Sequence, residues 1–128
     1  MPSCLITGAS GGIAAALAGR LRAEGWSLVL AGREPARIAA APGDEVLGTD
    51  VSTEAGAEHA ITAATEALGQ LPTAVAHCAG AVLVAPLART SEAQYRSCLA
   101  ANLDSAFFVA RAYAPRVQKA GQGGALLF

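Results

Sequence analysis

The fold is decided by "SCLITGASGGIAAALAGRL", residues 3–21. Residues 3–7 are a short apolar run that predicts a buried strand, and apolar side chains recur at helical spacing across 12–24, which predicts a helix. Between them lies "TGASGGIA", residues 7–14, with three glycines within five positions. A strand, a glycine turn and a helix in this order aim backbone N–H groups at a phosphate. An ordinary turn between a strand and a helix is the alternative.

The residues of this turn have separate expected tasks. Gly8 permits the tight turn, and Gly11 and Gly12 let a pyrophosphate approach without meeting a Cβ. Ser10 adds a hydroxyl donor. The spacing T-G-x-x-x-G-I-A differs from G-x-G-x-x-G, and a glycine cluster alone is a weak signal. Its position after the first predicted strand favours dinucleotide binding.

The rest of the chain alternates strands with helices. The predicted strands are continuous apolar runs, which is typical of a parallel sheet covered on both faces. We therefore predict one α/β domain over residues 1–128, a Rossmann-like doubly wound parallel sheet that is incomplete, with about five strands in the order 3-2-1-4-5. After the first strand and helix, the expected strands are 27–32, 45–51, 73–80 and 125–128, and the expected helical segments are 34–41, 54–68 capped by Thr53, and 91–119. The segment 91–119 is apolar over most of its length, so we expect it to be buried on more than one face.

Composition excludes several classes of partner. The net charge of −1 gives no reason to expect nucleic acid or an anionic membrane, and no apolar stretch approaches the length of a membrane span. The three cysteines form no CxxC pair, so a reduced, cytoplasmic compartment is expected. His77 has no cluster of metal ligands around it in the sequence, and no metal site is expected. Charged residues make up only 15% of the chain, which indicates that it has more apolar surface to bury than its own residues can cover.

The second predicted strand ends in "LAGR", where Gly32 leaves space and Arg33 supplies a planar cation. In a dinucleotide fold this point lies near the adenosine ribose. An acidic residue there holds the 2′-hydroxyl of NAD, whereas an arginine accommodates the 2′-phosphate of NADP. The charge favours NADP(H) over NAD(H), with a solvent-facing Arg33 as the alternative.

Together these pieces resemble the N-terminal part of the short-chain dehydrogenase/reductase family. "TGASGGIA" resembles the family's T-G-x-x-x-G-I-G turn, and "AGR" follows the second strand as it does there. "TDVS" matches the D-V pair beside the adenine, "HCAG" stands where the family usually has N-N-A-G, and "NLDSAFF" carries the family's helix asparagine. The order and spacing fit across nearly the whole chain.

The resemblance implies a role for each matching residue. It places the pyrophosphate against the glycine turn, the 2′-phosphate at the end of the second strand, the adenine at the D-V pair, and the ribose and nicotinamide after the fourth strand. The implied residues are Gly8, Ser10, Gly11, Gly12 and Ile13 for pyrophosphate, Arg33 for the 2′-phosphate, Asp50 and Val51 for adenine, and Cys78, Ala79 and Gly80 for ribose and nicotinamide. Asn102 is implied to order a water in the family's proton relay.

The chain departs from the family at positions 14 and 78. Ala14 replaces the third glycine of the turn, and Cys78 replaces an asparagine. We expect Cys78 to be a small buried thiol, with a redox role as the alternative. Cys4 and Cys98 are expected in the core and His59 on the surface of a helix.

The family's serine and Tyr-x-x-x-Lys do not occur within residues 1–128. We therefore expect this stretch by itself to bind NADP(H) weakly at most and not to reduce carbonyls. The first functional hypothesis is the cofactor half of an NADP(H)-dependent oxidoreductase acting on a small alcohol or carbonyl. The alternatives are a truncated, inactive dinucleotide-binding module or sensor, and an epimerase of the extended relatives. A homodimer through 91–119, or a complementing C-terminal segment, is the expected partner.

Overall fold

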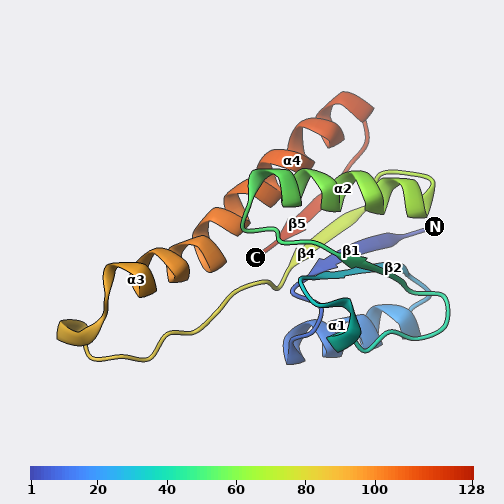
Figure 1. Cartoon of the computed structure of the whole chain (residues 1–128). Helices are drawn as coiled ribbons and strands as arrows, with labels where there is room; N and C mark the ends of the chain where they lie inside the picture. Colours follow the sequence, from blue (N-terminus) through green and yellow to red (C-terminus); the bar gives the residue numbers. More distant parts are fainter.

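A computed structural model describes residues 1–128 as a five-stranded parallel sheet flanked by helices on both faces (Figure 1). The strand order is β3-β2-β1-β4-β5, which confirms the predicted Rossmann-like topology. Helix α1 covers one face of the sheet, and α2 and α4 cover the other (Figure 1). The strands are β1 Ser3–Thr7, β2 Ser27–Gly32, β3 Glu45–Gly48, β4 Ala74–His77 and β5 Ala125–Leu127; the helices are α1 Gly12–Ala23, α2 Glu54–Leu68, α3 Glu92–Leu99 and α4 Ser105–Ala120.

Alternation along the central strands divides the core into two layers. On β1, Leu5 packs toward α2 and α4, while its neighbours Cys4 and Ile6 pack toward α1. On β4, Val75 joins the first layer and Ala76 the second. All of these side chains are almost wholly buried. The sheet is therefore covered on both sides, as the uninterrupted apolar runs predicted.

Helix α2 begins and ends as its sequence predicts. The Thr53 hydroxyl accepts a hydrogen bond from the Gly56 main-chain N–H at 3.0 Å, and Gly69 ends the helix with φ of 70°. Gly56 is required for a steric reason, because a Cβ there would lie 1.8 Å from the carbonyl oxygen of Asp50. The start of α2 thus packs directly on the loop that follows β3.

The segment between β2 and β3 is mostly not helical, which corrects the prediction of a helical segment over 34–41. A single 3₁₀ turn, Pro35–Arg37, is followed by irregular chain with a turn at residues 42–43. Residues 33–44 must return along the length of a strand to keep β2 and β3 parallel, and non-helical chain can cover more distance per residue than a helix. Ile38 anchors this connection in the core, and Arg22 of α1 pairs with the buried Asp44.

The predicted long helix over 91–119 is a rod of three helical segments. A π-helical segment, Ala100–Asp104, joins α3 to α4. No residue of α3 is buried, and α4 buries only one side. This corrects the expectation of burial on more than one face, because α2 alone packs along α4 and α3 extends beyond the sheet (Figure 1). No helix here combines the length and apolar character that crossing a membrane requires.

Candidate functional site

A cavity of about 360 Å³ lies at the carboxyl ends of β1, β2 and β4. This is the position at which open α/β sheets bind ligands, and the volume is within the range of small-molecule sites. The cavity brings together most of the predicted cofactor residues, namely Gly8, Ser10, Gly11, Arg33, Asp50, Val51, Cys78, Ala79 and Gly80. Gly12, Ile13 and Asn102 are not among its lining residues.

The glycine turn forms one wall of the cavity. Gly8 has φ of 62°, and a Cβ on it would lie 2.5 Å from the main-chain nitrogen of Ala79. Glycine at position 8 therefore allows the positive φ of the turn and also lets the chain after β4 approach closely. The Gly11 main-chain N–H donates to the Gly8 carbonyl at 3.0 Å, so that this amide is already used inside the turn.

The first turn of α1 is open. Its N-cap is Gly11, which has no side chain with which to cap the helix, and the first turn contains no acidic residue. A Cβ on Gly12 would have no atom within 4 Å, and the Ile13 side chain is 80% exposed. The predicted roles of Gly12 and Ile13 therefore depend on their main-chain N–H groups, which have no partner within the helix.

Two residues of opposite charge, Arg33 and Asp50, also line the cavity. Arg33 is exposed and takes part in none of the six ion pairs. Asp50 accepts hydrogen bonds from the Ser52 hydroxyl at 2.7 Å and the Ser52 main-chain N–H at 3.0 Å. The Ser52 hydroxyl is the main cause that lowers the pKa of Asp50, and the charge of Arg33 lowers it further. Asp50 is therefore a fixed anion beside an arginine with no ion-pair partner.

Asn102 lies in the π-helical segment and clamps the chain after β4. Its Nδ2 donates to the carbonyl oxygens of Ala81 at 2.8 Å and Cys98 at 2.9 Å, and its Oδ1 accepts from the Ala81 main-chain N–H at 3.2 Å. A Cβ on Gly80 would lie 2.7 Å from the same Oδ1. The structure gives Asn102 a positioning contact, and its role in a proton relay stays a prediction.

The cysteines only partly follow their predictions. Cys4 is buried, and burial raises the pKa of its thiol to about 11. Cys78 is half-buried, lines the cavity, and has a pKa raised by burial. Cys98 is also half-buried and not in the core, because it faces a second hollow. All three thiols are free.

The two histidines differ in environment. His59 is exposed on α2, as predicted. His77 is buried, and burial lowers its pKa. No group of three or more histidine, cysteine or acidic side chains could hold a metal ion.

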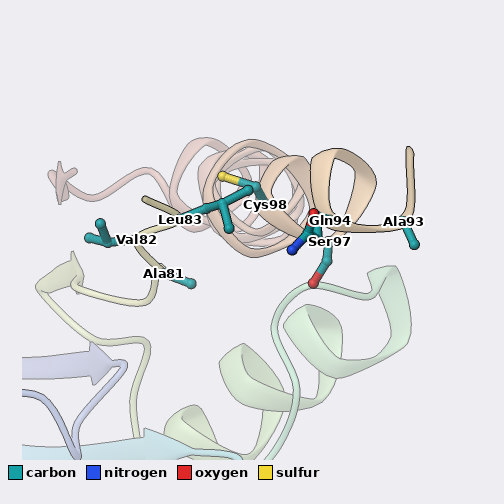
Figure 2. Close-up of a pocket in the computed structure, with 7 residues that line it drawn as sticks. All are labelled: Ala81, Val82, Leu83, Ala93, Gln94, Ser97 and Cys98. Atoms are coloured by element: carbon teal, nitrogen blue, oxygen red, sulfur yellow. The ribbon is translucent and has the colours of Figure 1, made fainter. Parts of the chain in front are cut away.

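The second hollow, of about 370 Å³, adjoins the cavity and shares Ala81 and Ser97 with it. One side is the segment that follows β4 and the other is α3, as Figure 2 shows. Its lining is mostly apolar: Ala81, Val82, Leu83, Ala93, Gln94, Ser97 and Cys98.

Some cavity residues were missed by the sequence reasoning. Thr49 and Ser52 flank the predicted pair Asp50–Val51 and could have been included with it. Ser97, Ala101 and Ser105 also line the cavity. They recur at intervals of four residues, a spacing that indicates one face of a helix.

A parallel sheet in this order, with a glycine turn after β1 and a cavity at its carboxyl edge, defines an α/β nucleotide-binding fold. Residues 3–128 match the short chain dehydrogenase family, and the chain belongs to that family. The chain is 30% identical over 131 residues to the NADP-dependent (R)-specific alcohol dehydrogenase of Lentilactobacillus kefiri, covering 96% of this chain and 51% of that protein. It thus spans about half the length of this curated relative.

Solved structures share the fold of this chain. A short-chain type dehydrogenase/reductase from Mycobacterium ulcerans superposes with a TM-score of 0.84 at 26% identity, covering 97% of this chain and 49% of that chain. A 3-ketoacyl-(acyl-carrier-protein) reductase from Brucella melitensis, complexed with NADH, gives 0.86 at 20% identity over 98% of this chain and 55% of that one. The second likeness shows the fold alone.

Proposed function

We propose that residues 1–128 are the cofactor-binding half of an NADP(H)-dependent oxidoreductase that interconverts an alcohol and a carbonyl. The observation that carries the proposal is the cavity at the carboxyl edge, which has an open helix N-terminus on one side and an arginine with no ion-pair partner on the other. The Lentilactobacillus relative, described as NADP-dependent, supports the same cofactor.

The residues fit a dinucleotide on steric and electrostatic grounds. Gly11 and Gly12 leave the start of α1 without side chains, and a pyrophosphate would lie there against free N–H groups. Ser10 adds a hydroxyl. Asp50 and the main chain of Val51 would border the adenine. The turn Cys78–Gly80 would border the ribose and nicotinamide.

The choice of NADP(H) over NAD(H) rests on the end of β2. Arg33 lines the cavity, and its guanidinium suits a phosphate. Glu34, the acidic residue that follows, lies outside the cavity lining and is 3.7 Å from Arg37. A 2′-phosphate would therefore meet a cation here.

When bound, the nicotinamide supplies or accepts the hydride of the reaction. The residues of this chain would bind, orient and exclude water. We place the apolar part of a substrate in the adjoining hollow between α3 and the segment after β4, which offers Gln94 and Ser97 as its polar groups.

The test compares the two cofactors on matched arginine variants. Arg33→Ala should weaken NADPH binding by about 1.5–3 kcal/mol, because a charge-assisted hydrogen bond is lost, and should leave NADH binding nearly unchanged. Arg37→Ala is the control, since Arg37 lies outside the cavity lining. Calorimetric titration measures both affinities. Equal losses for NADPH and NADH would contradict the choice of NADP(H).

A dinucleotide-binding module without catalysis is the second candidate. Tyr113 is 2% exposed and bonded to the Pro72 carbonyl, and Tyr95 is outside the cavity lining, so that neither tyrosine can donate a proton at the cavity. Binding of NADPH without oxidation of NADPH in the presence of aldehydes and ketones would favour this module.

A further inference from the structure

His77 belongs to a chain of hydrogen bonds that the proposed function does not use. Thr7 at the end of β1, His77 at the end of β4 and Ser105 at the start of α4 are all buried. His77 Nδ1 lies 2.8 Å from Thr7 Oγ1, and Nε2 lies 3.0 Å from Ser105 Oγ. The imidazole therefore joins the sheet to the helical layer next to the cavity that Ser105 lines.

The direction of each hydrogen bond in the chain follows from donor and acceptor roles. The Ser105 hydroxyl donates its one proton to the Ala101 carbonyl at 2.7 Å, because a carbonyl can only accept. Ser105 Oγ must therefore accept from His77, so that Nε2 carries a proton. In the neutral ring Nδ1 is then the acceptor, and the Thr7 hydroxyl donates to it. The buried ring is thus held in a single tautomer.

The same serine stabilises the π-helical geometry of residues 100–104. Its main-chain N–H donates to the Ala100 carbonyl, five residues back. In a regular α-helix that N–H would take the Ala101 carbonyl, which here accepts the Ser105 hydroxyl instead. Asn102 lies within this segment and binds both main-chain groups of Ala81. A change at Ser105 is therefore expected to reach the turn after β4.

We propose that His77 is a positioning residue, which acts through Ser105 to hold the π-helical segment so that Asn102 keeps its clamp on the main chain of Ala81. The value of this clamp for a bound cofactor rests on the proposed function. The hydrogen-bond chain itself does not, and it is tested without any nucleotide.

The first measurement is the ring tautomer in the unmodified protein. The chain contains only two histidines, so ¹⁵N-histidine labelling gives two imidazole signals. The exposed ring of His59 is the internal comparison and should show the mixture of tautomers of a solvated ring. We expect His77 to be neutral with its proton on Nε2. A proton on Nδ1 in the unmodified protein would overturn the proposal.

The second measurement compares the two sides of the same ring. Ser105→Ala removes the acceptor of Nε2–H, whereas Thr7→Val removes only the donor to Nδ1. Exchange of the Ala81 amide hydrogen, which Asn102 accepts, reports on the clamp. Ser105→Ala should accelerate it by about fivefold or more relative to the Leu30 amide of β2, which reports global opening. Thr7→Val should leave this ratio unchanged.

Asn102→Ala removes the clamp directly and sets the largest acceleration that can be seen. The proposal is overturned if Asn102→Ala accelerates exchange at Ala81 and Ser105→Ala does not, or if Thr7→Val accelerates it equally. If the Ser105 variant does not fold, the tautomer of the unmodified protein still decides the question. Failure to bind NADPH would contradict the proposed function and leave these results standing.

Discussion

The carboxyl edge of the sheet around β1 and β4 and the region of α3 and β5 are built in opposite ways. Around β1 and β4, Gly8 fits against the main chain of Ala79 and Gly80 against the side chain of Asn102, and each buried polar side-chain atom has a hydrogen-bond partner. Around α3 and β5, large apolar side chains lie open to solvent, among them Leu87 at 93%, Phe107 at 61% and Leu127 at 58% exposed. The first region is therefore closely packed, whereas the second leaves large apolar side chains exposed.

The largest expected effect is at Gly8. Gly8→Ala forces a left-handed backbone on a residue with a Cβ and drives that Cβ into Ala79, which we expect to cost about 3 kcal/mol of unfolding free energy. Gly12→Ala is the matched control, because it has open space around it and should change stability by under about 1 kcal/mol. Urea denaturation measures both. Similar values for the two variants would contradict the close packing of Gly8 against Ala79.

A smaller effect is expected at Tyr113, a core residue of α4. Its hydroxyl donates to the Pro72 carbonyl at 2.7 Å in a buried site. Tyr113→Phe leaves that carbonyl without its partner and should cost about 1–3 kcal/mol in thermal or urea unfolding. Tyr95→Phe on exposed α3 is the control and should cost under about 0.5 kcal/mol.

The third prediction concerns how His77, a buried residue of the first region, makes stability depend on pH. Burial lowers the pKa of His77 below 6.5, so the unfolded chain binds the proton more readily than the folded one. This contribution to stability is complete above pH 6.5 and is lost as the pH falls below that value. His77→Gln should flatten the dependence of the urea midpoint on pH across this window.

No charged partner complicates this interpretation. Thr7 and Ser105, which bond to the His77 ring, are uncharged, and Phe128 packs edge-on against it with the ring centroids 6.0 Å apart. The carboxyl pKa values of Asp44 and Asp50 are lowered from 3.8, so these groups respond only at more acid pH. A flat profile in the unmodified protein above pH 5 would contradict the buried neutral imidazole.

The smallest effect is expected in the exposed region. Leu87→Ser removes a side chain that is 93% exposed and should change unfolding free energy by less than about 0.5 kcal/mol. A loss of more than about 1 kcal/mol would mean that this side chain is buried in the folded protein in solution. Sedimentation of the unmodified protein tests the predicted homodimer through residues 91–119.

The sequence predicted those parts of the fold whose signals are local. The bounds of β1 and β2 matched because each is an unbroken apolar run, and α2 matched because Thr53 caps its start and Gly69 ends it. The connection after β2 was mispredicted because its alanines favour helix locally, whereas the short return between two parallel strands favours chain that covers more distance per residue than a helix. The prediction that 91–119 is buried on more than one face was wrong, because an apolar sequence does not reveal which faces of a helix pack against a neighbour.

In the candidate site too, only the features with a local sequence signal could be predicted. The cavity collects Gly8, Arg33 and Asp50 as predicted, because each ends or follows a strand at the same edge of the sheet. The clamp of Asn102 on Ala81 could not be predicted, since it depends on a π-helical segment with no sequence signal of its own. The partners of His77 come from β1 and α4, far away in the sequence.

The contacts at Gly8 and Gly80 also limit how this protein can diverge. A side chain at position 8 would need the backbone at Ala79 to retreat, and one at position 80 would need Asn102 to move. The backbone adjustment at Ala79 cannot be made by one substitution, so we expect variant libraries selected for folding to retain Gly8, whereas Gly80 should be retained wherever Asn102 is retained. Position 12, with nothing nearby, should vary freely under that selection and become restricted only when nucleotide binding is selected as well.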